Sequence, residues 1–289
     1  MVMPKRVSDR LTRSIGKFQQ VLTIAKDRDV NEADTVSIIK DMLAEIFGYD
    51  KYLDVTSEFA VRSTFCDLAI KVENKVEYLI EAKAIGLDLK EGHLRQAIDY
   101  GANNGVQWVI LTNGMTWQVY KIRFEKPINY DFVCSFNFAE LEPKNEEHLE
   151  KLYIICKEGL VKDAREEFHE KVLTVNRFIL GALVLSDEVV SVMRKELRKL
   201  SDGVLVTSEE ITNVLKNEVI KRDVLEGKDA AKAQTRVKKF YGKANRRPKE
   251  AETSKTPNQP QEQCKEGASF SDQLLSQGGQ QANPKPEPK

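Results

Sequence analysis

The hydrophobic positions of the first fifty residues repeat at helical spacing. Within residues 8–26 the apolar side chains recur every three or four positions, as one buried helix face requires. These are Leu11, Ile15, Phe18, Val21, Leu22 and Ala25. A second stripe follows Asn31, a residue suited to a helix N-cap, and Glu32 falls in the first turn, where a carboxylate complements the helix dipole. The pattern predicts one helix over 8–26 and another from Asn31 to a C-cap at Gly48.

Beyond residue 54 the apolar positions form short runs that are typical of β-strands. We expect strands at 55–61, 65–72, 78–85, 107–112, 115–122 and 131–138, with a helix over 88–102. The polar turn 73–75 joins the second and third strands as a hairpin, and Asn113-Gly114 joins the next pair. This order predicts an α/β fold, a mixed sheet flanked by helices.

The pattern is helical again from Asn145 onwards. Ser186 is placed to cap a helix that runs to Leu200, and residues 207–210 have the sequence of a capping box. After Pro248 the chain is rich in Gln, Pro, Lys, Glu, Gly and Ser, with too few large apolar residues to form a core. We therefore predict an α/β domain over 1–140, a helical region over 141–243 and a disordered polar tail over 244–289.

The amino-acid composition says less about possible binding partners than the local sequence pattern does. The formal net charge is zero, so nucleic-acid binding requires a local basic patch. The densest basic run, 236–249, has two interpretations of equal weight: a phosphate-binding segment or a solvated helix end. No apolar run is long enough to cross a membrane, and the four cysteines have no zinc-ligand or disulfide spacing. We expect a cytoplasmic protein with no membrane partner.

The candidate chemistry lies on the second and third predicted strands. Asp67 is followed thirteen residues later by Glu81, and Lys83 is two positions beyond Glu81. Side chains two apart in a strand share a face, so Glu81 and Lys83 project together from an otherwise apolar run. If the hairpin forms, Asp67 approaches Glu81.

Two neighbouring carboxylates need a compensating charge. At about 4 Å they repel by roughly 4 kcal/mol at an effective dielectric of about 20. A divalent cation removes that repulsion, and oxygen ligands of this kind suit Mg²⁺. A metal-bound water can then attack phosphorus while the cation stabilises the charge that develops on the phosphate.

Asp67 with Glu81-Ala82-Lys83 resembles the D…(D/E)xK signature of the PD-(D/E)xK nuclease superfamily. Further features are similar to the N-terminal domain of the R subunits of type I restriction enzymes. Gln96 and Tyr100 form a QxxxY pattern on the helix after the motif lysine, and 111–114 reads LTNG, followed by Trp117. The resemblance covers residues 30–122. Cys66 stands where many members have proline, and no helicase motor or GxxxxGK[ST] loop follows, so we expect no use of ATP.

The resemblance implies a restriction-endonuclease-like nuclease domain that cuts DNA with Mg²⁺, or with Mn²⁺ as the alternative ion. Asp67 and Glu81 would hold the metal, Glu32 would complete its site, and Lys83 would assist the attacking water. Gln96 and Tyr100 would support the site or contact DNA.

Other classes of function remain open at this point. The same fold can serve as a catalytically inactive module that binds nucleic acid or docks a partner, and the C-terminal helices are a candidate surface for a protein partner. A third class is an assembly protein that oligomerises through those helices. For the individual residues, the competing interpretation is structural: a surface ion-pair set for Asp67, Glu81 and Lys83, and a first-turn carboxylate for Glu32.

Overall fold

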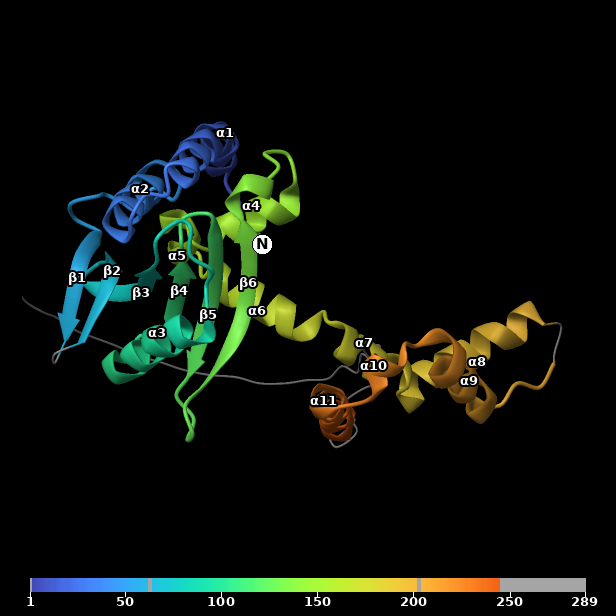
Figure 1. Cartoon of the computed structure of the whole chain (residues 1–289). Coiled ribbons are helices and arrows are strands. Elements are labelled where there is room, and N and C mark those ends of the chain that lie inside the picture. The colour runs from blue at the N-terminus through green and yellow to red at the C-terminus, as the bar shows by residue number, and fades with distance from the viewer. Residues whose placement is uncertain (1, 62–63, 202–203, 245–289) are drawn as a thin grey trace, which may run out of the picture. The chain divides into compact units, whose positions relative to one another are not determined.

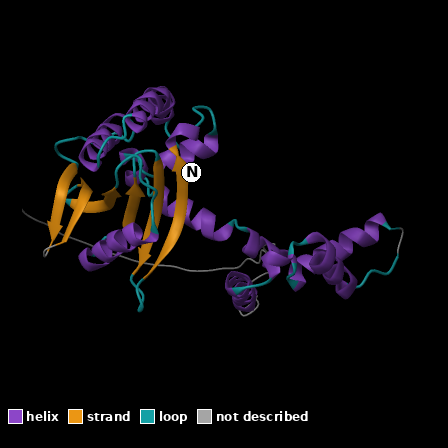
Figure 2. Cartoon of the chain, in the orientation of Figure 1, coloured by secondary structure: helices purple, strands orange, loops and turns teal. Residues whose placement is uncertain are grey.

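A mixed six-stranded sheet with helices on both faces forms the N-terminal part of the protein, and a helical region follows it (Figures 1 and 2). The structure is a computed structural model that describes residues 2–61, 64–201 and 204–244. The α/β fold and the helical region predicted from the sequence are therefore confirmed. The predicted polar tail, apart from its first residue, lies outside the described residues.

The strands are β1 (Val55–Val61), β2 (Thr64–Val72), β3 (Lys75–Ala82), β4 (Trp108–Thr112), β5 (Thr116–Arg123) and β6 (Asn129–Asn137). The helices of the first half are α1 (Lys5–Asp27), α2 (Glu32–Glu45) and α3 (Glu91–Asn104), with a short 3₁₀ turn at Phe138–Glu140. Those of the second half are α4 (Glu146–Tyr153), α5 (Lys157–Val161), α6 (Ala164–Thr174), α7 (Arg177–Val184), α8 (Asp187–Leu200), α9 (Ser208–Val214), α10 (Arg222–Leu225) and α11 (Lys228–Ala244).

The strands lie in the sheet in the order of the sequence. β1, β2 and β3 form an antiparallel meander, and β4, β5 and β6 form another. The two meanders meet where β3 pairs with β4 in parallel, because α3 carries the chain back across the sheet between them. The hairpin between β2 and β3 is the predicted one, and its register pairs Leu68 with Ile80.

Strand alternation divides the buried side chains between two cores. On one face Ile70, Tyr78 and Ile80 pack in the cluster that holds the apolar stripes of α1 and α2. On the other face Ala69 and Leu79 pack in the cluster that holds the apolar residues of α3. Figure 1 shows the same layering, with α1 and α2 on one side of the sheet and α3 on the opposite side.

The third predicted strand is wrong at its C-terminal end. The run 78–85 was expected to stay in the sheet to Ile85, but β3 ends at Ala82. The Lys83 N–H still donates to the Thr112 carbonyl at 2.9 Å, whereas the Ile85 N–H donates to the Thr35 hydroxyl of α2 at 3.1 Å. Ile85 is buried in the core of that face, so its apolar character reflects tertiary packing and not strand pairing.

The core on the α1 face continues past residue 140 into the following helices. It includes Leu152, Tyr153 and Phe168, which come from α4 and α6. The packed core thus extends past residue 140 to Phe168, and the domain boundary at residue 140 stays a prediction.

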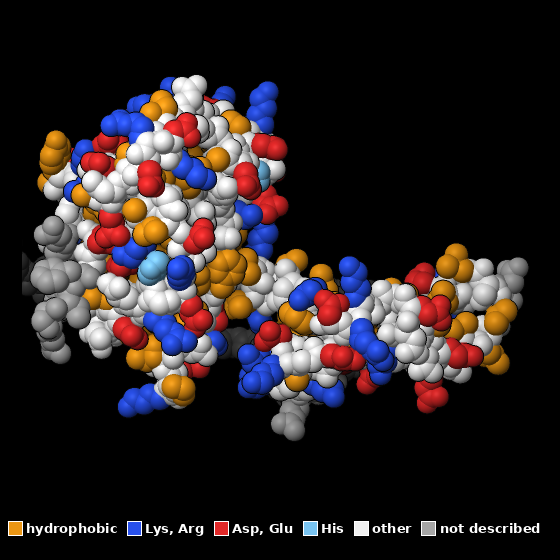
Figure 3. All heavy atoms as spheres, viewed as in Figure 1, with side chains coloured by type: hydrophobic (Ala, Val, Ile, Leu, Met, Phe, Trp, Pro, Cys, Tyr) orange, Lys and Arg blue, Asp and Glu red, His pale blue; other side chains and the backbone are white. Residues whose placement is uncertain are grey.

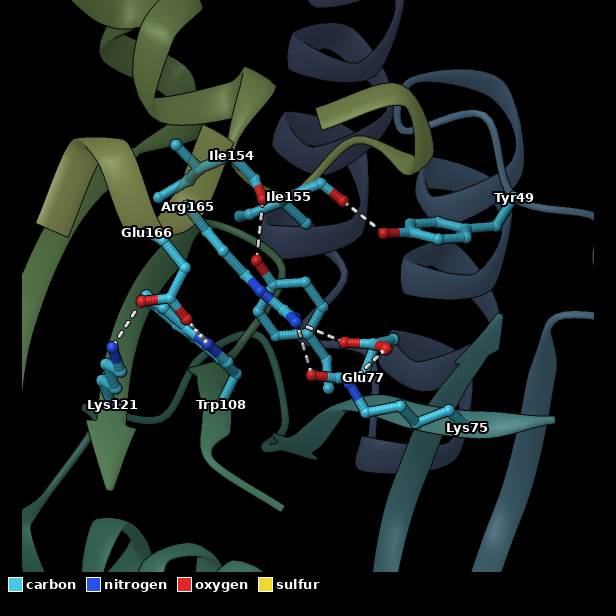
Figure 4. A network of polar contacts seen from close by, with 10 residues as sticks. Tyr49, Lys75, Glu77, Trp108, Lys121, Ile154, Ile155, Arg165 and Glu166 are labelled. Carbon is cyan, nitrogen blue, oxygen red and sulfur yellow. Dashed lines mark hydrogen bonds and ion pairs between the residues drawn. The ribbon is translucent and has the colours of Figure 1, made fainter. Parts of the chain in front are cut away.

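Arg165 of α6 fixes this helix against the sheet through a largely buried cation (Figure 4). Its guanidinium donates to the Glu77 carbonyl at 3.0 Å and contacts the Glu77 carboxylate. The same group lies 5.1 Å from the ring centroid of Tyr78 and 5.3 Å from that of Trp108, within the range of cation–π attraction. Next to it, Glu166 accepts from the Trp108 indole at 3.2 Å.

The helices after residue 176 have a small cluster of their own. Val190, Ile211 and Leu215 are its buried members. Two sequence predictions are confirmed here: Ser186 caps α8 by accepting from the Val189 N–H, and the Thr207–Glu210 capping box starts α9. In the described part of the chain, no helix is both long and apolar enough to cross a membrane.

We expect Arg165→Met to lower the free energy of unfolding by about 3 kcal/mol, because removing one partner of a buried ion pair leaves the other uncompensated. Chemical denaturation measures this change. Arg177→Met is the matched control, since Arg177 forms an exposed ion pair with Asp223 and such pairs contribute little. Equal losses in the two variants would contradict the role given to Arg165.

Candidate functional site

The hairpin of β2 and β3 brings Asp67 and Glu81 together. Leu68 pairs with Ile80 in this antiparallel hairpin. One residue further along, the same register places Asp67 opposite Glu81. The Asp67 carboxylate accepts the Ala82 N–H at 2.7 Å, which ties it to the adjacent strand. Two of the residues that the sequence predicted for one site therefore lie on neighbouring strands, at the same level of the sheet.

Lys83 lies directly beside Glu81, although it follows the last residue of β3. The Lys83 ammonium is 2.8 Å from a Glu81 carboxylate oxygen and 3.6 Å from a Glu32 oxygen. Glu32 reaches this point from the first turn of α2, which Asn31 caps by accepting the Asp34 N–H at 2.9 Å. The structure thus brings Glu32, Lys83 and Glu81 into one ion-pair cluster.

Burial makes this cluster electrostatically unusual. Only 2% of Glu81 is exposed to solvent. Burial is the main reason that the pKa of Glu81 is raised, and the negative charge of Asp67 raises it further, whereas the hydrogen bond to Lys83 lowers it. The pKa of Asp67 is also raised, mainly by burial, although its bond to the Ala82 N–H acts in the opposite direction. Both carboxylates are therefore less stable as anions here than they would be in water.

Lys83 stays charged in the same environment. Burial disfavours its ammonium, but the hydrogen bond to Glu81 and the charges of Glu81, Asp67 and Glu32 outweigh that effect and raise its pKa. Together with the neighbouring Asp67, the cluster has three carboxylates and one ammonium. Its excess negative charge and its hard oxygen donors match the requirements of Mg²⁺ or Mn²⁺.

A protein-only metal cage is not formed. Over the residues that the structure describes, no three His, Cys, Asp or Glu side chains gather closely enough to hold an ion. Asp67 and Glu81, which the β2–β3 hairpin places opposite each other, offer two carboxylates. This matches the usual coordination of Mg²⁺, which keeps several water ligands and takes only one or two carboxylates.

The two α3 residues predicted for the site differ in their surroundings. Tyr100 is buried among the side chains that pack α3 on the sheet. Gln96 is exposed on the same helix. Their support of the site or contact with DNA stays a prediction.

Cys66, next to Asp67, is a packing residue. It is 1% exposed, and burial raises the pKa of its thiol to about 12, so it remains neutral.

The two tryptophans of the sequence, Trp108 and Trp117, are fully buried as well.

Asn113, which belongs to the β4–β5 turn and to the LTNG motif, makes hydrogen bonds that the sequence did not predict. Its side-chain amide donates to the Leu87 carbonyl at 2.8 Å and lies 3.4 Å from the Ile85 carbonyl. Its side-chain oxygen accepts the Thr116 N–H at 2.7 Å. Asn113 thereby connects the β4–β5 turn to the segment that follows Lys83. The LTNG motif was a signal of this connection, but its partner could not be read from the sequence.

The comparisons with known proteins agree with the resemblance drawn from the motif. Residues 38–135 match the family model described as the type I restriction enzyme R protein N terminus (HSDR_N), which is about a third of the chain. The matched segment contains Asp67, Glu81 and Lys83, whereas Glu32 precedes it. Neither the curated proteins nor the solved structures gave a match to this chain. Part of the protein is thus similar to the N-terminal domain of restriction-enzyme R subunits, a nuclease-type domain.

We expect Asn113→Ala to lower the free energy of unfolding by about 1 to 2 kcal/mol, since it removes the side-chain donor to the Ile85 and Leu87 carbonyls, the first of them buried. The amides of residues 85–87 should also exchange faster with solvent, which hydrogen-exchange mass spectrometry measures. Asn129→Ala is the control, because the Asn129 side chain bonds only to the neighbouring Tyr130 N–H. Unchanged exchange at 85–87 would contradict the positioning role.

Proposed function

We propose that the sheet domain is a metal-dependent deoxyribonuclease that hydrolyses phosphodiester bonds. The observation that carries the proposal is the juxtaposition of Asp67, Glu81 and Lys83 across β2 and β3. It lies within the segment that matches the N terminus of restriction-enzyme R proteins. Membership of the PD-(D/E)xK superfamily, and a role in restriction of foreign DNA, belong to the same proposal.

Asp67 and Glu81 are the residues that would hold Mg²⁺ or Mn²⁺. A divalent ion supplies two kinds of chemistry in such a site: it acidifies a bound water and neutralises charge on the phosphate. Glu32 is the third proposed ligand, and in the structure it is paired with Lys83. No nucleotide cofactor is part of the proposal.

Lys83 carries the remaining chemistry. Its raised pKa keeps it protonated at neutral pH, so it can donate hydrogen bonds and oppose negative charge but does not act as a base. Held by Glu81 at 2.8 Å, it would orient the attacking water and stabilise the charge that accumulates on the phosphate oxygens. Its side chain is only 13% exposed, so this charge acts with less screening than one on the surface.

We expect the purified protein to cut plasmid DNA with Mg²⁺ or Mn²⁺, and not with EDTA. Lys83→Ala should reduce the rate by at least about 100-fold, as removal of a group that stabilises transition-state charge does. Lys75→Ala is the control, because Lys75 starts β3, at the end of the strand away from Lys83, and pairs with Glu77.

Two outcomes would contradict this function. Cleavage that Lys83→Ala leaves intact would place the chemistry elsewhere or assign it to a contaminant. Absence of cleavage by folded wild-type protein, on supercoiled and linear DNA, would favour a binding or partner-docking module with the same fold.

Metal binding has a readout that is independent of cleavage. We expect Mn²⁺ to raise the melting temperature of the wild-type protein, by the equivalent of about 2.7 kcal/mol at a concentration 100 times the dissociation constant. Asp67→Asn should abolish this increase, although an asparagine oxygen can still accept the Ala82 N–H and preserve the fold. Equal Mn²⁺-induced shifts in wild type and variant would exclude Asp67 as a ligand. Differential scanning fluorimetry provides the measurement.

A further inference from the structure

Helix α11 has an apolar face that the protein itself covers. Ala230, Ala233 and Val237 are buried, at 2%, 4% and 8% exposure. Ala230 and Val237 line a hollow together with Phe178 of α7 and Val224 of α10. The apolar side of α11 is therefore engaged within the helical region.

The opposite face of α11 is basic. Lys228, Lys232, Arg236 and Lys239 follow one another at intervals of four, four and three residues, and all four are exposed. At about 100° per residue, they fall within roughly 80° of the helix circumference, and at about 1.5 Å per residue they extend over roughly 17 Å. We call these four residues the α11 basic face. Figure 3 shows lysine and arginine side chains gathered over this helix.

This charge is largely uncompensated within the helix. α11 has six basic residues and one acidic residue, Asp229, which lies 3.4 Å from Lys232. By contrast, α8 mixes both signs, and its Lys199 is paired with Glu196 at 2.7 Å. Because the whole chain has no net charge, the concentration of positive charge on α11 is a local feature.

We propose that the α11 basic face binds the sugar-phosphate backbone of a DNA duplex, as a contact separate from the β2–β3 site. Regularly spaced lysines and an arginine can neutralise successive phosphates without reading base edges, so the contact would be independent of sequence. The choice of DNA rests on the proposed nuclease function. The face would keep substrate on the protein between encounters with Asp67, Glu81 and Lys83.

An anionic membrane is the competing partner for a basic helix, and the structure disfavours it. A helix that lies on a membrane inserts its apolar side into the lipid while its basic side faces the headgroups. Here Ala230, Ala233 and Val237 on the apolar side are already buried, and two of them line a hollow shared with α7 and α10. Phe240, near the C-terminal end of α11, is 66% exposed, but the face that Lys228, Lys232, Arg236 and Lys239 form is charged, which suits a polyanion in water.

The test substitutes only the lysines. Arg236 also donates to the Leu173 carbonyl at 3.0 Å, so its removal would confuse binding with folding. The test variant is the triple Lys228→Gln, Lys232→Gln, Lys239→Gln. The control is the triple Lys195→Gln, Arg198→Gln, Lys199→Gln on α8, which removes the same charge from another exposed helix.

Fluorescence anisotropy with a 20-base-pair duplex measures binding by the full chain. EDTA is present and salt is varied, so neither metal nor cleavage contributes. For the α11 variant we expect affinity at 0.1 M salt to fall by about tenfold or more, and the slope of log K against log salt to decrease by about 2 to 3. The control should retain affinity and slope. Circular dichroism checks that both variants are folded.

Three outcomes would overturn the proposal. Equal binding by the α11 variant and wild type would move the DNA contact elsewhere, and absence of binding by wild type would remove it. Binding to phosphatidylserine vesicles without binding to the duplex would assign the face to membranes. If the duplex is bound through α11 but plasmid is not cut, the nuclease proposal fails while this inference stands.

Discussion

Two carboxylates that face each other across β2 and β3 impose the main constraint on this protein. Glu81 is almost completely buried, and burial raises the pKa of both Glu81 and Asp67, so the fold holds negative charge where it is unfavourable. Replacing a buried ion pair with well-packed apolar residues is often neutral or stabilising, so stability alone does not account for charged groups at these positions. The arrangement is understandable if these residues act on a cation and a phosphate that bind after folding, because functional sites often lower the stability of the folded protein.

The surrounding structure holds these carboxylates in place from several directions. Parallel pairing with β4 continues to the Lys83 N–H, which fixes the backbone at the end of β3. Thr35 and Asn113, from α2 and the β4–β5 turn, satisfy backbone groups of the segment that follows. On the α1 face, Arg165 anchors α6 to the opposite end of β3 through Glu77. The site is therefore built on strands, and helices α2 and α6 support those strands.

What the sequence predicted well depended on local physics. Asn31, Ser186 and the Thr207–Glu210 box are helix starts because their side chains bond to backbone within three residues, and each was found as expected. The β2–β3 hairpin and the juxtaposition of Glu81 and Lys83 followed from strand alternation and a short turn. The features that the sequence did not predict depend on residues that are distant in the chain. The end of β3 at Ala82 is set by Thr35, and the role of Asn113 is set by Leu87. The buried position of Arg165 between Tyr78 and Trp108 has no signature in a local window.

The most direct test of this account is a crystal structure of the protein soaked in Mn²⁺, with anomalous diffraction measured above the manganese absorption edge. We predict an anomalous peak within about 2.0 to 2.3 Å of carboxylate oxygens of both Asp67 and Glu81, with water completing the coordination. The Lys83 ammonium should remain beside Glu81. A structure at saturating Mn²⁺ with no peak between these two carboxylates would contradict their assignment as metal ligands.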